Sequence, residues 1–130
     1  MSRESVFLLL VATGLTPIAL SYGLLPQVSL SFLFDVDASS TNLIHTFRAI
    51  MGLYLGLVVF WMAGARKESL RLAALWSLAI FMSGLAAGRI VSLVFDGMPH
   101  PLLVFFLVLE LGIGFFGFYL IRQYCQFSPI

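Results

Sequence analysis

Residues 72–95 read LAALWSLAIFMSGLAAGRIVSLVF, an apolar stretch in which Arg89 is the only charged residue. About 20 apolar residues suffice for a helix to cross the hydrocarbon core of a bilayer, so this stretch predicts a transmembrane helix. Stretches of similar length and character at 5–25, 42–65 and 102–124 predict three more. We therefore predict an all-α fold in which residues 1–130 form one domain, an integral membrane four-helix bundle.

The composition supports this assignment and excludes other classes of protein. The chain is 61% hydrophobic and only 10% charged, too few polar residues to cover a soluble domain of this length. A net charge of +1 does not provide the basic surface that nucleic acids need, so no nucleic-acid partner is expected. Cys125 is the only cysteine, which excludes an intrachain disulfide.

The first span has a short positive end at Arg3, as a signal peptide does. However, residues 5–34 contain no charge, whereas the apolar core of a signal peptide has roughly 7–15 residues. We therefore expect a retained helix rather than a cleaved leader.

Positive charges in the short connections predict the orientation. The two connections at 26–41 and 96–101 contain no lysine or arginine, and their acidic residues are Asp35, Asp37 and Asp96. Apart from Arg48 and Arg89, the basic residues all fall on the other side: Arg3, Arg66, Lys67, Arg71 and Arg122. Because lysine and arginine are enriched in cytoplasmic connections, both termini and the 66–71 connection are predicted to be cytoplasmic.

The 26–41 connection shows a period-two pattern. Val28, Leu30, Phe32, Phe34 and Val36 alternate with mostly polar residues, which favours an extended segment with one apolar face. Such a segment would lie on the bilayer surface as a connector or fold over the helix ends as a lid. The surface connector is the simpler interpretation.

Three charged residues lie deep within the predicted spans: Arg48, Arg89 and Glu110. A charge there costs roughly 2.5–3.5 kcal/mol on insertion scales, so it usually faces a partner or a wet cavity. At ~1.5 Å per residue, the three lie about 9, 9 and 12 Å below the outer ends of their helices. Similar depths on three spans predict that Glu110 contacts at least one of the two arginines.

Helical spacing places these charges on faces that carry small residues. The predicted polar network comprises His45, Arg48, Arg89, Ser92, Asp96 and Glu110. The glycines predicted to mark close helix packing are Gly52, Gly56, Gly84, Gly88, Gly114 and Gly117. A kink at Pro17 would let Ser21 and Tyr22 reach the network. Trp61 and Trp76, near the cytoplasmic ends of their spans, are typical of residues that anchor a helix at the interface.

Two interpretations of the network stay open. In the structural one, Glu110 neutralises one or both arginines and fixes the helix register. In the functional one, two arginines and one carboxylate leave a positive charge that an anionic ligand completes from outside. Proton handling by Glu110 and His45 is a third. The sequence contains no pattern for a catalytic residue, a metal ligand or a bound cofactor, so we expect none of the three.

The sequence also resembles a known family. The stretches HTFRAIMGLYLG at 45–56, GRIVSLVFDGMP at 88–99 and EL at 110–111 are similar to small bacterial four-helix membrane proteins, the domain-of-unknown-function family 4345. The resemblance extends from the first span to the fourth. It implies the architecture and a multi-pass place in a bacterial inner membrane, and it implies no activity.

These observations predict a non-enzymatic inner-membrane binding or accessory protein with a polar pocket that opens outward. Its expected partners are the lipid bilayer, an anionic or lipid-like ligand, and a second copy or another membrane protein. The alternatives are a small membrane enzyme for a lipid-like substrate, with Glu110 and His45 as acid and base, or a transport component.

Overall fold

The computed structural model describes residues 1–127 and contains five helices and no strand in that range. They are α1 (Arg3–Gly23), α2 (Pro26–Phe34), α3 (Thr41–Arg66), α4 (Glu68–Phe95) and α5 (Pro101–Phe127). The helices α1, α3, α4 and α5 are long and apolar enough to cross a membrane. The all-α fold with four candidate spans is thereby confirmed, and this architecture indicates a membrane protein.

Short polar side chains and prolines begin the helices. The hydroxyls of Ser2 and Ser40 accept hydrogen bonds from the backbone N–H groups of Ser5 and Leu43, which satisfies donors left free at the starts of α1 and α3. Pro26 and Pro101 occupy the first positions of α2 and α5, where the missing N–H costs nothing. Gly97 follows α4 with a φ of 96°, a conformation that suits glycine.

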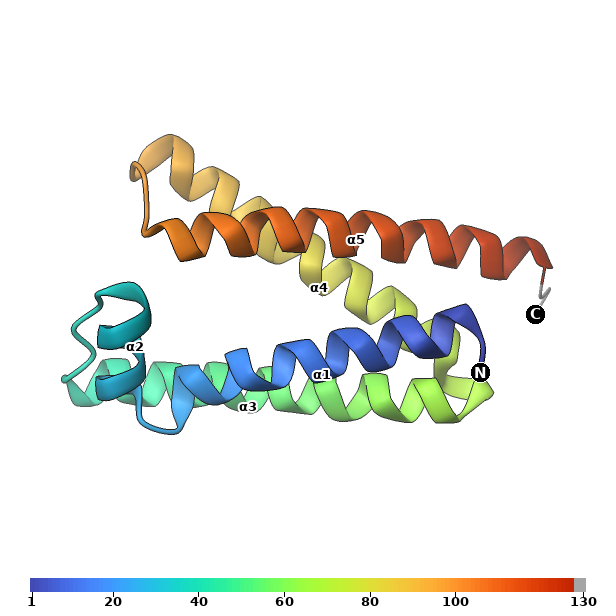
Figure 1. Ribbon diagram of the computed structural model, residues 1–130, viewed down its shortest axis with the longest axis horizontal. Helices are drawn as coiled ribbons and strands as arrows, with labels where there is room; N and C mark the ends of the chain where they lie inside the picture. The colour runs from blue at the N-terminus through green and yellow to red at the C-terminus, as the bar shows by residue number, and fades with distance from the viewer. Residues whose placement is uncertain (128–130) are drawn as a thin grey trace.

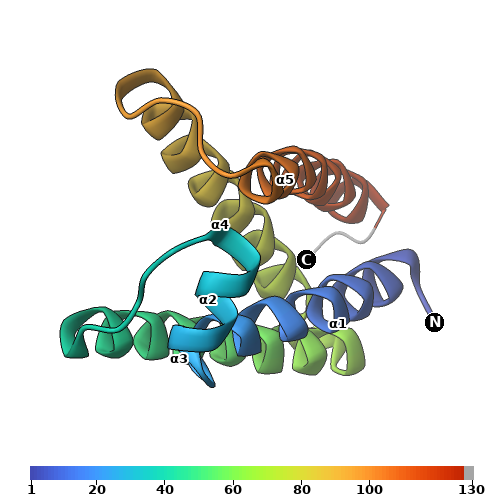
Figure 2. The same cartoon turned by 60° about the vertical axis from the view of Figure 1, so that its left-hand side comes forward.

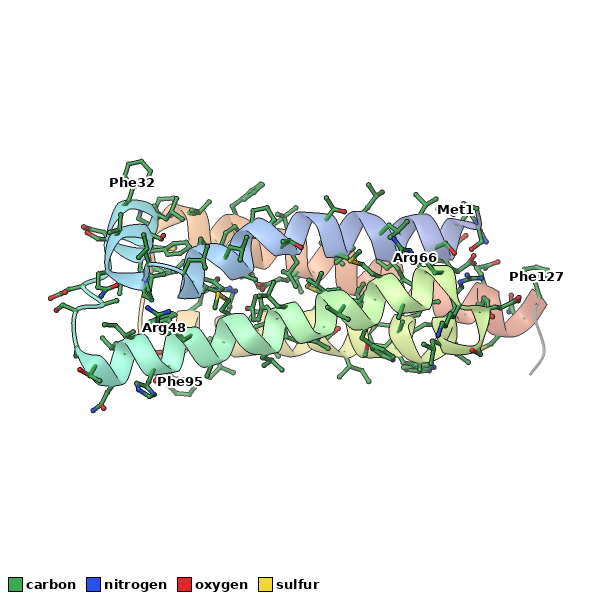
Figure 3. All side chains as sticks on the ribbon, turned by 90° about the horizontal axis from the view of Figure 1, so that it is seen from below. Met1, Phe32, Arg48, Arg66, Phe95 and Phe127 are labelled. Atoms are coloured by element: carbon green, nitrogen blue, oxygen red, sulfur yellow. The ribbon has the colours of Figure 1, made fainter. Side chains whose placement is uncertain are left out.

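The prediction of an extended segment after the first span is wrong, because residues 26–34 form the helix α2. Pro26, Leu30 and Phe34 are four residues apart and are the buried positions of α2. Phe32 is 86% exposed and points away from the other helices (Figure 3). The residues four apart in the alternating pattern also match a helical face, so the same letters fit both structures. The helix stops at Asp35, which adopts a left-handed conformation.

The long helices pack mainly as two pairs, α1 with α3 and α4 with α5, and α4 crosses against α3 (Figure 1). Met1, Arg66 and Phe127 lie at one end of the molecule, which we call the inner end (Figure 3). The helix α2 and the turn between α4 and α5 lie at the opposite end, which we call the outer end. Toward the outer end, α4 diverges from the α1–α3 pair, as Figure 2 shows.

The contacts between α3 and α4 are concentrated toward the inner end. Lys67 alone separates the two helices, and Arg71 donates hydrogen bonds to the carbonyl oxygens of Gly64 and Ala65 at the end of α3. Trp61 is fully buried, and its Nε1–H donates to the hydroxyl of Ser77 on α4 over 3.0 Å. The prediction that Trp61 is an interface anchor is therefore wrong: its ring fills the space between two helices.

Glycines mark close helix contacts at only some of the predicted positions. A Cβ on Gly114 would lie 3.0 Å from the Ser83 hydroxyl, and one on Gly117 would lie 3.2 Å from the Ala79 Cβ, so both permit close approach of α5 to α4. The prediction of close packing is wrong at four glycines, because a Cβ there would meet nothing within 4 Å: Gly52, Gly56, Gly84 and Gly88. The sequence pattern also missed Gly23 and Gly64, which face Met51 and Ala74.

Gly64 and Gly56 provide a matched test of the α3–α4 contact. Gly64→Ala is expected to lower the free energy of unfolding by about 1–3 kcal/mol, since a methyl group there overlaps Ala74 Cβ. Gly56→Ala is expected to be neutral or to stabilise by roughly 0.5–1 kcal/mol, because it enters open space within the same helix. Thermal unfolding of the two variants in detergent measures the difference. Equal effects would contradict the close approach at Gly64.

Candidate functional site

Arg89 of α4 and Glu110 of α5 form an ion pair in the outer half of the molecule. Arg89 Nε donates to both carboxylate oxygens of Glu110, over 3.0 and 2.9 Å. Glu110 is 7% exposed. Glu110, Gly114 and Gly117 share one face of α5, and the two glycines let that face approach α4 closely. The same spacing that predicted the charged stripe therefore brings the carboxylate to Arg89.

Two aromatic side chains lie beside the guanidinium of Arg89. Its Cζ lies 5.9 Å from the ring centroid of Phe106, within the range of a cation–π contact. Tyr22 of α1 lies beside Arg89, and its ring is 5.5 Å from that of Tyr54 of α3 in an edge-to-face arrangement. All four long helices thus contribute one polar side chain to this cluster, which we call the Arg89 cluster: Tyr22, Tyr54, Arg89 and Glu110.

A cavity of about 350 Å³ borders the Arg89 cluster between α1, α4 and α5. We call it the tail cavity. Among the described residues, Arg89 and Glu110 are the only charged ones that line it, and apart from Tyr22, Tyr54 and Gly14 the others are apolar. Its wall on α1 runs from Phe7 to Tyr22, which is about 22 Å of helix at ~1.5 Å per residue. At its inner end the rings of Phe7 and Phe116 meet edge to face, 5.2 Å apart.

Two further cavities also reach Arg89. One of about 680 Å³ lies between α3 and α4, is bordered by Leu30 and Phe34 of α2, and includes Gly84 and Gly88 in its wall. Another of about 100 Å³ lies between α4 and α5 near Pro99. The guanidinium therefore stands where three cavities meet, although the helices that hold it are predominantly apolar.

The structure does not place the six residues of the predicted network together. His45 and Arg48 are exposed on the outer half of α3, line none of these cavities, and within residues 1–127 form no ion pair. Figure 3 shows Arg48 near the outer end, at the same end as Phe32 and Phe95. Ser92 donates to Asp96, the residue that follows α4, over 2.7 Å, and this contact is exposed. Only Arg89 and Glu110 are joined across two helices.

Sequence reasoning placed Tyr22 near the charged residues and missed Tyr54. Ser21, the neighbour of Tyr22, instead donates to the Ile18 carbonyl of its own helix over 2.7 Å. Tyr54 had no such signal, because its position six residues after Arg48 puts it on a different face of an apolar helix, where it reads as a packing residue. In the part of the chain that the structure describes, no group of His, Cys, Asp and Glu has the arrangement to hold a metal ion.

Comparison with protein families matches residues 4–121 to one family, described as Domain of unknown function (DUF4345). This range includes all four residues of the Arg89 cluster and nearly the whole of the four long helices. No curated protein and no solved structure matches the chain.

Proposed function

We propose, for a chain that belongs to the family described as Domain of unknown function (DUF4345), that it binds a lipid-like molecule within the membrane. The observation that carries this proposal is the combination of a long apolar cavity with an ion pair in its wall. Ligand sites have this character: mostly apolar walls, a few polar groups that fix orientation, and a volume of roughly 300–1,000 Å³.

The shape of the tail cavity suits a single chain with one polar end. Leu10, Gly14 and Ile18 border it along α1, so an extended acyl or isoprenoid chain would lie parallel to that helix. Its polar end would reach Arg89 and Tyr22 in the outer half. Gly14 has no atom within 4 Å of an added Cβ, so the cavity is open beside it.

We place the protein in the inner membrane of a bacterium, with the inner end in the cytoplasm. The orientation is supported by the basic residues other than Arg48 and Arg89, which lie in the 66–71 connection or near the two ends of the chain. Reporter fusions within 66–71 should report the cytoplasm, and fusions at Gly97 should report the outside. The opposite result at both positions would reverse the proposed orientation.

The enzyme alternative has less support. An acid–base pair of Glu110 and His45 requires both groups to reach one substrate, yet Glu110 is paired with Arg89 while His45 is exposed on α3 and borders none of the cavities. The arrangement therefore favours binding over acid–base chemistry at these two residues.

A photoreactive acyl chain tests the proposal. The protein is reconstituted in phosphatidylcholine vesicles and exposed to a diazirine-bearing fatty acid or its methyl ester, and labelled residues are mapped by mass spectrometry. We expect at least one probe to label the tail cavity, at positions such as Ile18 and Leu109. Gly14→Leu should remove most of this labelling because the side chain fills the cavity.

Gly112→Leu is the matched control. Gly112 is a glycine in a membrane-spanning helix, has no atom within 4 Å of an added Cβ, and borders none of the three cavities. Labelling should therefore be unchanged in this variant. Labelling of wild type spread evenly over the outer surfaces of the helices, or equal labelling of wild type and Gly14→Leu, would overturn the proposal.

A further inference from the structure

We infer that the ligand of the tail cavity is an uncharged lipid whose polar end accepts hydrogen bonds, such as an ester or ketone, rather than an anionic lipid. This inference rests on the proposed function and names the class of ligand. It follows from the net charge of the Arg89 cluster and from the donors of Arg89 that Glu110 leaves unoccupied.

The charge of the cavity wall is balanced before any ligand binds. Arg89 and Glu110 are the only charged residues among the described residues of the wall, and Glu110 contacts the guanidinium over 2.9 Å. Arg48, the second arginine that was expected to leave a residual positive charge, does not border the cavity. A carboxylate bound near Arg89 would therefore be a second negative charge beside Glu110, in surroundings that screen repulsion poorly.

Although the charges of the wall are balanced, the wall holds more hydrogen-bond donors than Glu110 occupies. Glu110 is bonded through Arg89 Nε alone, so the two terminal nitrogens of the guanidinium keep N–H donors that Glu110 does not occupy. The phenol of Tyr22 is close to them, and a second phenol, that of Tyr54, adjoins it. A carbonyl oxygen supplies an acceptor for these donors without adding charge.

The experiment compares three competitors of equal chain length against the photoreactive probe: methyl laurate, laurate and dodecane. They are added to the reconstituted protein in a buffer alkaline enough to keep laurate ionised. We expect methyl laurate to halve the labelling of the tail cavity at a concentration at least about tenfold lower than either other competitor. The same order of competitors should hold in Gly112→Leu.

Glu110→Gln provides the sharpest comparison, because among the described residues of the wall it leaves Arg89 as the one charged residue. Laurate should then become the strongest competitor. If Glu110→Gln does not fold, the double change of Arg89→Gln and Glu110→Gln keeps the wall neutral and removes the guanidinium donors. In that variant methyl laurate should lose its advantage over dodecane.

The outcomes separate this inference from the proposed function. If laurate competes as well as methyl laurate in the wild type, the wall accepts an anion and the inference is wrong. If dodecane competes equally, the polar end contributes nothing and the inference is wrong, while binding in the cavity stands. If both variants fold and neither changes the order of competitors, the Arg89 cluster does not determine the choice and the inference is wrong. If neither the fatty-acid probe nor its methyl ester labels the tail cavity, the proposed function is wrong.

Discussion

Glu110→Gln is expected to lower the free energy of unfolding by about 3–5 kcal/mol, the range measured when one partner of a buried ion pair is removed. The variant leaves the Arg89 guanidinium between apolar helices without its counter-charge. The amide can replace part of the hydrogen bonding and none of the charge. Thermal or denaturant unfolding in a mild detergent measures the loss.

Asp37→Asn is the control, because Asp37 is exposed and its carboxylate only accepts from the backbone N–H of Ser39. This change should alter stability by less than about 0.5 kcal/mol. A double-mutant cycle of Glu110→Gln with Arg89→Gln should show a coupling of roughly 0.5–3 kcal/mol. Losses that simply add would mean that the two side chains do not interact in the folded protein.

Trp61→Ala is expected to be similarly destabilising, by about 3 kcal/mol or more, since truncation of a buried tryptophan usually costs 3–5 kcal/mol. The ring of Trp61 is fully buried and packs edge to face against Phe81, 5.9 Å away, so its loss opens a void between α3 and α4. The value lies toward the lower end of that range because lipid or detergent also solvates the ring in the unfolded state.

Two further substitutions separate the contributions of the Trp61 hydrogen bond and of its burial to stability. Trp61→Phe keeps an aromatic ring and removes the hydrogen bond to Ser77, which should cost about 1–2 kcal/mol. Trp76→Ala is the matched control, because Trp76 is 43% exposed and its ring contacts that of Phe118 on α5. If Trp76→Ala destabilises as much as Trp61→Ala, burial between α3 and α4 does not explain the role of Trp61.

The spans could be predicted from the sequence because the requirement of a bilayer is simple. A helix must continue through about 20 apolar residues, and the polar clusters at 35–42, 66–71 and 96–100 interrupt the apolar run where the helices end. The helix α2 could not be predicted in the same way. Over nine residues, burial at Pro26, Leu30 and Phe34 is compatible with period two and with a helical period, and contacts with neighbouring helices decide between them.

The candidate site could be predicted in part. Depth and spacing predicted that Glu110 meets an arginine, and it meets Arg89. The sequence could not choose between Arg89 and Arg48, because both lie at similar depth with glycines nearby. That choice depends on how each helix is rotated and how far it stands from α5, and α4 packs on α5 while α3 packs on α1 and α4. The same holds for Gly52 and Gly84, which no neighbouring helix contacts closely. GxxxG spacing alone does not show whether another helix faces the two glycines.

The inner-end contact between α3 and α4 has a consequence for local unfolding. In α3 the first buried residue is Tyr54, and in α4 the last is Ala86, so residues 41–53 and 87–95 contain no fully buried side chain. Segments with few buried contacts open at lower free energy than the rest of a protein. In detergent, amide hydrogens of 87–95 should therefore exchange with deuterium sooner than those of 74–86 in the same helix. Within α3 and α4, the protein is thus predicted to fluctuate more beside Arg89 than around Trp61. A lipid chain would then enter between the outer parts of the two helices while their contact at the inner end stays closed.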